Sequence, residues 1–459
     1  MKEKIINYLE DKKTILLGFG KEGISSYHFI RSYFPDLQIT IADRNTIDVS
    51  DIVEDRHVTF VFGSQYDQNL NDFDIILKSP GINLSHINYL IDPKKISSQT
   101  DLFLMAYRNQ VIGVTGTKGK STTSSLIYHI LNSAGKKVLL AGNIGTPLFD
   151  TIHAIDNDTV IVAELSAHQL EYLHYSPHIA LFLNCFPEHL DHFTSFNDYQ
   201  LAKFNILHYQ TENDTFIYNR DNIHIANLFH QHHYQRQTYP FSKENAPSDG
   251  AFADNKNIYL YENKEVVSTF HLEGLSHLPG KHNFYNIMAA ILAVKRYHCS
   301  DEDIVKALHS FKPLEHRIEF IGTLQGINFY NDSISTIPEA TIAAVNAVKN
   351  CDTLILGGFD RGIDYSELIA FLHQSKIRNI AFVGAVGKRI LKEWQAYHHG
   401  IDKKYIIEND YSKIVAFAFA NTQKGATCLL SPAASSYDQF KNFEERGTQF
   451  KNLILDFIQ

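Results

Sequence analysis

Short apolar, β-branched runs alternate with stretches of helical spacing along most of the chain. The runs in the first hundred residues are 14–18, 38–42, 57–63 and 74–80. Later runs are 111–114, 137–142, 159–166, 178–185, 326–332, 353–358, 379–384 and 426–432. This alternation is typical of sheets whose parallel strands are joined by helices. The pattern therefore predicts an α/β fold.

Shifts in the pattern predict three domains. A chain of 459 residues is too long for a single hydrophobic core. The first domain is expected to span residues 1–107, the second 108–313 and the third 314–459. Within the second, residues 214–270 become β-rich and polar.

Composition excludes several classes of protein. Hydrophobic residues make up 44% of the chain and charged residues 20%, as in ordinary globular proteins. A formal charge of −9 argues against nucleic acid and anionic membranes as partners. No apolar stretch approaches the roughly 20 residues of a membrane span, and residues 1–10 lack a signal-peptide core. The four scattered cysteines form no CxxC pair, so we expect free thiols and a cytoplasmic protein.

The stretch QVIGVTGTKGKSTT, residues 110–123, has the order of a strand, a phosphate loop and a helix over 124–134. Glycines let the backbone approach a phosphate, and the Lys120 ammonium can reach the terminal phosphates. The hydroxyl of Ser121, directly after the lysine, is where Mg²⁺ would be held. Val114 occupies the place of the first glycine of the strict motif, so a plain glycine-rich turn is the alternative.

Two acid or base residues follow the next strands. Glu164 ends the run 159–166, and His189 lies just beyond the run 178–185. Because neighbouring parallel strands end at the same crevice, both side chains could reach a Mg²⁺ that bridges the phosphates. Lys203 lies in the helical stretch 197–209, where a lysine ordinarily faces solvent.

A second glycine motif lies near the N-terminus. Gly18, Gly20 and Gly23 follow the first strand, and Asp43 with Arg44 ends the next strand about 20 residues further on. This fingerprint is typical of NAD-binding domains, but it suits a nucleotide diphosphate such as a UDP-sugar equally well. Asp43 or Arg44 would then contact the ribose or the base. The turn at 79–81, with Ser79 and Gly81, follows a strand at the edge where open sheets bind ligands, although it could be a plain turn.

Together these motifs resemble the Mur ligases. The likeness rests on the order and spacing of GTKGKST (116–122), ELS (164–166), EHLDH (188–192), GKHNFYN (280–286), EHR (315–317), NDS (331–333) and SPAASSYDQFKNFEERG (431–447). The last stretch and the short N-terminal domain are most similar to the D-glutamate-adding branch. The resemblance implies an N-terminal Rossmann-like domain for UDP, a central P-loop-type ATPase domain and a C-terminal dinucleotide-fold-like domain for the amino acid.

The resemblance also implies roles for individual residues. Lys120, His189 and Lys203 would be catalytic. Ser121 and Glu164 would hold one Mg²⁺, and His189 with a carbamylated Lys203 the second. ATP would contact Gly116, Thr117, Lys118, Gly119, Lys120, Ser121, Thr122, Asn283, Asn286, Arg317 and Asp332. The UDP-substrate would contact Gly18, Gly20, Gly23, Asp43, Arg44, Ser79, Gly81 and Asn143. Glutamate would contact Thr336, Arg361, Ser436 and Phe443.

The implied activity is ATP-dependent ligation of D-glutamate to UDP-N-acetylmuramoyl-L-alanine through an acyl phosphate, by a monomer making peptidoglycan precursors. Four residues depart from the usual pattern of the branch: Pro187, Ile334, Ile337 and Arg361. Most lie on the glutamate side, so a variant that adds L-glutamate stays open. An NAD-dependent oxidoreductase and a non-catalytic nucleotide-binding protein are the alternatives from other classes.

Overall fold

The protein is described from a computed structural model that covers residues 1–47, 49–50, 52–143, 146–190, 192–231, 236–273, 278, 282–312, 315–398 and 403–457. Its chain forms two compact units. The first comprises Met1–Gly274 and Lys281–Phe311, and the second Leu275–Gly280 and Lys312–Gln459. Each unit is described by itself.

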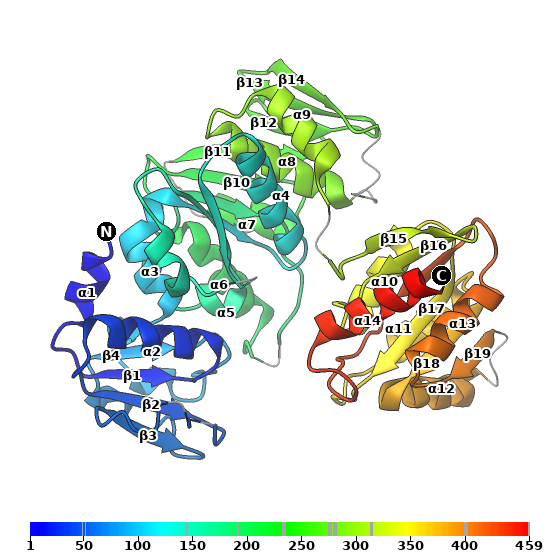
Figure 1. Cartoon of the computed structure of the whole chain (residues 1–459). Helices are drawn as coiled ribbons and strands as arrows, with labels where there is room; N and C mark the ends of the chain where they lie inside the picture. The colour runs from blue at the N-terminus through cyan, green and yellow to red at the C-terminus, as the bar shows by residue number, and fades with distance from the viewer. Residues whose placement is uncertain are drawn as a thin grey trace. The chain divides into compact units, whose positions relative to one another are not determined.

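The first sheet of the first unit has the strand order β3-β2-β1-β4-β5, with every pair parallel. Its strands are β1 (Thr14–Leu17), β2 (Ile39–Asp43), β3 (Val58–Phe62), β4 (Ile75–Lys78) and β5 (Ile96–Ser97). Helix α2 (Lys21–Tyr33) follows β1 and lies along one face of this sheet (Figure 1). Helices α1 (Glu3–Leu9) and α3 (Gln99–Tyr107) contact one another. This strand order is that of a dinucleotide-binding half, with β1 in the middle.

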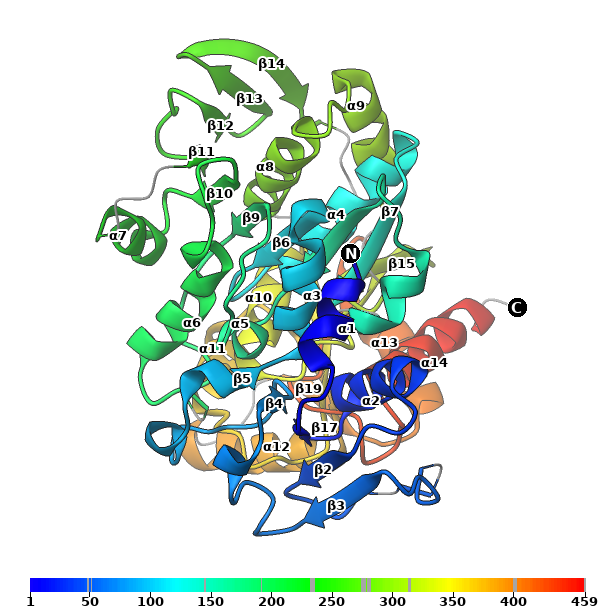
Figure 2. The same cartoon turned by 90° about the vertical axis from the view of Figure 1, so that its left-hand side faces the viewer.

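The second sheet has the order β14-β13-β12-β11-β10-β9-β6-β8-β7. It is parallel from β7 to β12 and antiparallel from β12 to β14, which follow one another at one edge (Figure 2). Its strands are β6 (Val111–Thr115), β7 (Val138–Gly142), β8 (Val160–Glu164), β9 (Ile179–Phe182), β10 (Thr215–Asn219), β11 (Gln237–Ser242), β12 (Gly250–Ala253), β13 (Asn257–Glu262) and β14 (Glu265–His271). Every residue of β6, β8 and β9 is buried, as expected of central parallel strands covered on both faces.

Helices surround this second sheet. They are α4 (Lys120–Ser133), α5 (Ala167–Leu170), α6 (Phe196–His208), α7 (Ile223–Gln231), α8 (His282–Lys295) and α9 (Asp301–Ser310). Helix α4 packs against α8 and α9, and α5 packs against α6. The glycine loop connects β6 to α4. It therefore lies between a buried strand and a helix that packs against its neighbours.

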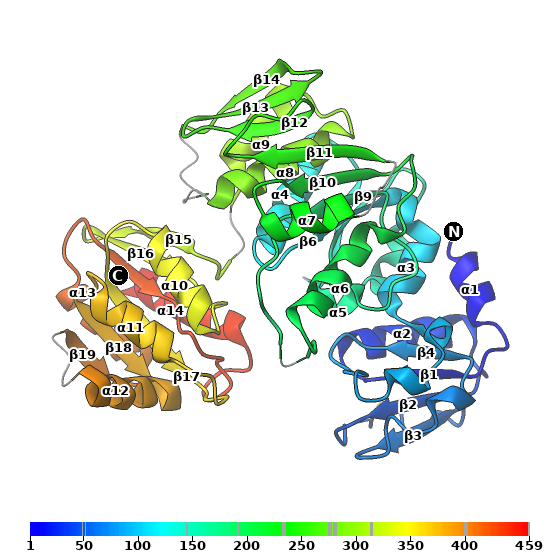
Figure 3. The same cartoon turned by 180° about the vertical axis from the view of Figure 1, so that it is seen from behind.

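The second unit contains a sheet with the order β15-β16-β20-β17-β18-β19. Its strands are β15 (Glu319–Leu324), β16 (Ile327–Asn331), β17 (Cys351–Gly358), β18 (Asn379–Val383), β19 (Lys404–Ile407) and β20 (Thr427–Leu430). Two apolar cores cover its faces. One is formed by α10 (Pro338–Ala347), α11 (Ser366–Gln374) and α12 (Gly384–His398), and the other by α13 (Tyr411–Asn421) and α14 (Phe443–Asp456) (Figure 3).

The structure confirms the α/β class and the strands expected from the apolar runs. The phosphate-loop helix begins at Lys120, four residues before the predicted start, because the left-handed Gly119 ends the loop directly before it. The cysteines are free, and three of the four are buried. None of the helices in the described residues is both long and apolar enough to cross a membrane. The domain boundaries at 107 and 313 stay predictions.

Candidate functional site

The glycine loop after β6 has a backbone geometry that strongly favours glycine at one position. Gly119 adopts a left-handed backbone with φ +86°, and a Cβ built on it would lie 2.5 Å from Asn286 Oδ1. The backbone N–H of Thr117 donates to the carbonyl of Asn184, and that of Lys118 donates to Asn184 Oδ1. The loop is thereby bonded to Asn184, just beyond β9, and at Gly119 it lies close to Asn286 of α8.

Lys120 is the first residue of α4, and its side chain folds back over the loop. Its ammonium donates to the carbonyl oxygens of Gly116, at 2.9 Å, and Thr117, at 3.1 Å. Ser121 follows in the first helical turn and is only 6% exposed. The structure thus places a cation and a hydroxyl at the start of a helix, where phosphate groups are bound in other proteins.

Glu164 ends β8, opposite Val114 of β6 and Gly142 of β7. The residue is 2% exposed, and Asn143 Nδ2 donates to its Oε1 at 2.7 Å. Its Oε2 is buried without a hydrogen-bond partner among the described residues. A buried carboxylate oxygen without a partner is costly unless a cation lies beside it. The residues present therefore fit a hard cation such as Mg²⁺ at this strand end.

Lys203 lies on α6, and its side chain reaches the same loop rather than solvent. It is 1% exposed, and its ammonium donates to the Gly116 carbonyl oxygen at 2.9 Å. Burial, together with the charge of Lys120, lowers the pKa of Lys203 well below its ordinary value. One helical turn earlier, the hydroxyl of Tyr199 lies 3.0 Å from Thr117 Oγ1. The solvent-facing alternative for Lys203 is wrong.

His189 lies beyond β9 with a left-handed backbone, φ +59°, and its side chain is half exposed. Its Nε2 is 4.0 Å from Glu188 Oε2, and Glu188 pairs with Lys118 at 2.6 Å. Its ring lies 4.8 Å from that of His168, centroid to centroid. Burial, with His192 and His189 close by, lowers the pKa of His168 to about 3, so that imidazole is neutral.

Asn283 and Asn286, which are predicted to contact ATP, lie at the start of α8. Asn286 Nδ2 donates to Asn283 Oδ1 at 2.9 Å, and both residues are buried. Asn286 also borders the phosphate loop at Gly119. Asn143, predicted to contact the UDP-substrate, lies beside Glu164 instead of in the pocket described next. Its role in binding that substrate stays a prediction.

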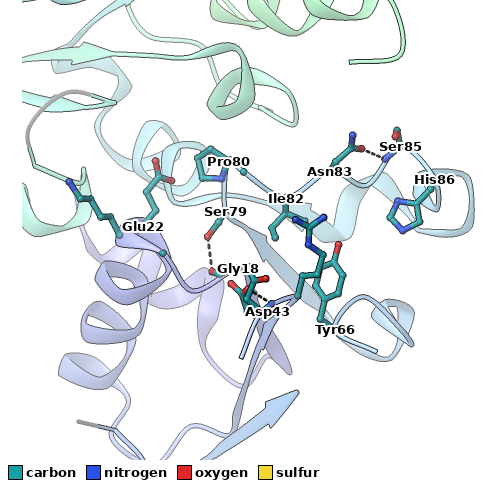
Figure 4. A pocket seen from close by; sticks show the side chains of 15 residues that line it. Gly18, Glu22, Asp43, Tyr66, Ser79, Pro80, Ile82, Asn83, Ser85 and His86 are labelled. Atoms are coloured by element: carbon teal, nitrogen blue, oxygen red, sulfur yellow. Dashed lines mark hydrogen bonds between the residues drawn. The ribbon is translucent and has the colours of Figure 1, made fainter. Parts of the chain in front are cut away.

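A cavity of about 600 Å³ opens at the carboxyl ends of the first sheet's strands (Figure 4). Six of the predicted UDP-substrate residues line it: Gly18, Gly20, Asp43, Arg44, Ser79 and Gly81. Gly23 lies behind the wall, where a Cβ would approach the Gly18 carbonyl oxygen to 2.4 Å. Sequence reasoning missed Tyr66 and Asn83, which come from loops without a recognisable motif.

Asp43 organises the glycine turn of this cavity. Its Oδ2 accepts from the Phe19 N–H at 3.0 Å, and its Oδ1 accepts from the Asn45 N–H at 2.9 Å. The Ser79 hydroxyl donates to the Gly18 carbonyl oxygen at 2.7 Å. The two predicted motifs of the first domain are therefore joined directly, and the N-terminus of α2 opens into the space between them.

Glu22 stands in the first turn of α2, and its side chain points away from Asp43 and Tyr66 (Figure 4). Gln169 Nε2 donates to Glu22 Oε1 at 2.7 Å, whereas Oε2 is buried without a hydrogen-bond partner among the described residues. Burial outweighs the Gln169 hydrogen bond and the charge of Lys78, and raises the pKa of Glu22 to about 7.

This raised pKa predicts how stability depends on pH. The unfolded chain loses the Glu22 proton near its ordinary pKa of 4.5, and the folded chain only near 7, so this carboxyl lowers the stability as the pH rises through that window. We expect Glu22→Gln to raise the melting temperature by about 1–4 °C more at about pH 8 than at about pH 4.5. Calorimetry at both pH values measures it. An equal change at both would show that the Glu22 charge has no such cost.

All four residues predicted to bind glutamate lie in the second unit, and two of them, Arg361 and Thr336, are in direct contact. Arg361 Nη2 donates to the Thr336 carbonyl oxygen at 2.9 Å. Ser436 is 2% exposed, and its carbonyl oxygen accepts from the N–H groups of Gln439 and Phe440. Phe443 begins α14, and its carbonyl oxygen accepts from the Ser333 hydroxyl at 2.8 Å.

Arg446 holds these loops in place, and sequence reasoning missed it. It is 1% exposed on α14, and its guanidinium donates to the Ser333 hydroxyl at 2.9 Å, the Ser333 carbonyl oxygen at 2.8 Å and the Ala434 carbonyl oxygen at 3.1 Å. The planar guanidinium thereby fixes the NDS and SPAASS segments against one another. Its signal in the sequence is a single arginine in a charged helix, which ordinarily faces solvent.

Asp332 and Arg317 are neighbours of this cluster. Asp332 is 2% exposed, and its carboxylate accepts from the Ser431 hydroxyl at 2.7 Å and the Ile318 N–H at 3.1 Å. Burial raises the pKa of Asp332 to about 6. Arg317 Nε is buried without a partner among the described residues. The phosphate loop belongs to the first unit and these two residues to the second, so their contact with ATP stays a prediction.

Among the described residues, no group of three or more His, Cys, Asp and Glu side chains is placed to hold a metal ion. The set Ser121, Glu164, His189 and Lys203 is of a different kind, because two of its members are a hydroxyl and a lysine. Such a set needs the phosphates of a nucleotide to complete an oxygen environment.

Comparison with known proteins finds likeness over the whole chain. Residues 114–294 match the model of the Mur ligase middle domain. The UDP-N-acetylmuramoylalanine–D-glutamate ligase of Ruminiclostridium cellulolyticum is 33% identical over 461 residues, with 97% of each chain covered. The enzyme of the same name from Clostridium acetobutylicum is 32% identical, with 98% of each covered. The solved structure of the UDP-N-acetylmuramate-alanine ligase MurC from Thermotoga maritima matches with a TM-score of 0.58, at 14% identity over 98% of this chain and 99% of that one, which shows the fold alone.

Proposed function

The chain belongs to the Mur ligase family, and from this premise we propose that it joins D-glutamate to UDP-N-acetylmuramoylalanine, with hydrolysis of ATP to ADP and phosphate, during peptidoglycan precursor synthesis in the cytoplasm. The observation that carries this proposal is the likeness over 97% of the chain to ligases of that name. The glycine loop, the buried Glu164 and the cavity beside Asp43 support it independently.

The ATP phosphates would lie over residues 116–122, where backbone N–H groups and the Lys120 ammonium meet them. Ser121 and Glu164 would hold one Mg²⁺, and His189 with a carbamylated Lys203 the second. When bound, these ions neutralise phosphate charge and polarise the phosphorus that is transferred. The buried Oε2 of Glu164, which has no hydrogen-bond partner among the described residues, supports a cation at this strand end.

The reaction would proceed in two steps. A carboxylate oxygen of the alanyl group attacks the γ-phosphorus, the bond to ADP breaks, and an acyl phosphate forms. The glutamate amine then attacks the acyl carbon through a tetrahedral intermediate, phosphate leaves, and the amine gives up a proton. Lys120 stabilises the charge on the transferring phosphoryl group, and the loop fixes its direction of approach.

The pocket beside Asp43 would receive the UDP moiety. Its diphosphate would meet the N-terminus of α2, whose first N–H groups and positive dipole end favour an anion. Arg44 and Tyr66, which also line the pocket, offer a cation and an aromatic ring to the ribose and base. We propose that Thr336, Arg361, Ser436 and Phe443 hold the glutamate.

The choice of enantiomer is the sharpest test of this function. The D-glutamate-type segment 431–447 supplies Ser436 and Phe443. Ile334 cannot supply a positive charge to the glutamate carboxylates, but Arg361 can. A site that fixes both carboxylates misplaces the amine of the mirror image, so we expect L-glutamate to react at least about 10²-fold more slowly. The measurement is ADP release and product mass with UDP-N-acetylmuramoyl-L-alanine, ATP, Mg²⁺ and each enantiomer at equal concentration.

Omission of each substrate in turn is the control. Phosphate release that needs all three substrates separates the ligase from a protein that only binds nucleotide, and an absence of NADH oxidation separates it from an oxidoreductase. Faster ligation of L-glutamate would change the assigned substrate to L-glutamate, and the assignment as a ligase would stand. No ligation of either enantiomer would overturn the proposed function.

A further inference from the structure

The loop that lines the pocket of the first sheet is bonded to the turn that carries His189. Asn83 lines the pocket, and its Nδ2 donates to the His192 carbonyl oxygen at 2.8 Å, across 109 residues of sequence. The Asn83 Oδ1 accepts from the Ser85 N–H at 2.8 Å (Figure 4). Both ends of the Asn83 amide therefore have hydrogen-bond partners.

A second link runs beside the first. Lys78 ends β4 directly before Ser79 of the pocket, and its side chain is 2% exposed. Its ammonium lies 3.2 Å from Glu171 Oε2, and the same oxygen lies 3.2 Å from His192 Nε2. The main chain and the side chain of His192 are therefore both connected to β4 and the loop that follows it.

The turn itself transmits this restraint to His189. The N–H groups of His192 and Phe193 both donate to the His189 carbonyl oxygen at 3.0 Å. His168 packs against both imidazoles, with ring centroids 4.4 Å from His192 and 4.8 Å from His189. The left-handed backbone of His189 is uncommon for a residue with a side chain, and such a conformation persists where its surroundings impose it.

We propose that Asn83 and Lys78 are positioning residues for His189, so that filling the pocket with the UDP-substrate strengthens metal binding at the ATP site. This inference rests on the proposed function. A ligand that orders the loop 79–86 holds Asn83 against His192, and the turn then presents the His189 imidazole in one place. By linkage, the metal and nucleotide must strengthen binding of the UDP-substrate by the same factor.

The experiment measures this coupling by binding, without turnover. Mn²⁺ serves as the probe, because it accepts the same oxygen and imidazole ligands and is followed by its EPR signal. The dissociation constant of Mn²⁺ is measured with a non-hydrolysable ATP analogue, with and without saturating UDP-N-acetylmuramoyl-L-alanine. For the natural protein we expect the UDP-substrate to tighten Mn²⁺ binding about 10-fold, within the usual range of couplings.

The variants separate positioning from mere loss of substrate binding. Asn83→Ala should reduce the coupling to within about 2-fold of none while leaving Mn²⁺ binding without UDP-substrate nearly unchanged. Asn45→Ala is the matched control, because Asn45 lines the same cavity, and among the described residues its side chain has no hydrogen bond to His189, His192 or Phe193. It should retain the coupling once the pocket is saturated. Lys78→Met, which breaks the second link, should weaken the coupling in the same direction, and thermal melting verifies that each variant is folded.

Each outcome decides the matter. Coupling in the natural protein that disappears in Asn83→Ala and survives in Asn45→Ala supports the proposal. Coupling that survives in both Asn83→Ala and Lys78→Met, or binding of the UDP-substrate with no effect on Mn²⁺, would overturn it and leave the ligase function standing. A natural protein that binds no UDP-N-acetylmuramoyl-L-alanine at all would instead overturn the proposed function, and this inference with it.

Discussion

Replacing Lys120 with alanine is expected to lower kcat by at least about 10²- to 10³-fold, the usual loss when one donor to a developing charge is removed. The Lys120 ammonium is held over the loop by the carbonyl oxygens of Gly116 and Thr117. Under the proposed function it would meet the transferring phosphoryl group there. The alanine variant leaves the backbone of the loop in place, and alanine is a good helix former at the start of α4. The measurement is steady-state ADP release together with a melting curve.

Two further variants show whether charge or position matters at this lysine. Lys120→Arg keeps the charge but imposes a planar fork, so we expect an intermediate loss. Lys137→Ala is the control for removing a lysine, because that side chain is half exposed and pairs with Asp156 at the surface. It should leave kcat within about 2-fold, as expected for an exposed ion pair. Near-normal turnover of a folded Lys120→Ala protein would refute the assignment of the loop.

Much of the fold could be predicted from the sequence, because its central strands are buried on both faces. For this reason the sequences of β6, β8 and β9 are almost entirely apolar. The glycines after β6 indicate the loop that follows it. The two edge strands of the second unit's sheet, β15 and β19, gave no such signal. Strand β19 is mostly exposed, and it exists through its hydrogen bonds to β18 rather than through an apolar pattern of its own. Strand β15, also at an edge, was missed for the same reason.

The candidate site was predictable where a motif is local. The glycines, Lys120 and Ser121 stand within seven residues, and the structure places them on the loop and the first turn of α4. Residues that act through distant partners could not be found in this way. Arg446 donates to Ser333, 113 residues away, and Asn83 donates to His192, 109 residues away. Neither the hydrophobic periodicity nor the spacing of a motif identifies such pairs. A polar side chain can be buried only where a hydrogen-bond partner replaces the water it loses, and that partner can lie anywhere in the sequence.

Lys203 is another residue whose environment could not be predicted from the local sequence. Its helical setting suggests a solvent-facing lysine, yet the side chain is 1% exposed and its ammonium points at Gly116. A buried ammonium beside a second lysine is costly, and the same conditions that lower its pKa favour the neutral amine. A neutral amine adds CO₂ to give a carbamate and a proton. The carbamate is an oxygen donor suited to Mg²⁺, whereas the ammonium is not.

We therefore expect Lys203→Met to abolish most activity, by about 10²-fold or more, without loss of stability. Methionine keeps an unbranched stem of similar length, and it removes a buried charge whose desolvation opposes folding. Lys306→Ala is the control, because Lys306 is an exposed lysine on helix α9 and should change neither property. Assays of ADP release and melting curves for both variants measure the difference.

Dependence on CO₂ distinguishes the carbamate from a lysine that acts through its charge. Activity should fall in a CO₂-depleted, mildly acidic buffer, where the amine is protonated and the adduct dissociates, and it should return when bicarbonate is added. With ¹³C-labelled bicarbonate the natural protein should show a carbamate resonance that is missing from Lys203→Met. If activity ignores CO₂ and no such resonance forms, Lys203 acts as an amine or an ammonium hydrogen-bonded to Gly116. It would then order the loop rather than bind a metal ion, and the second Mg²⁺ would have to rely on His189 and the phosphates.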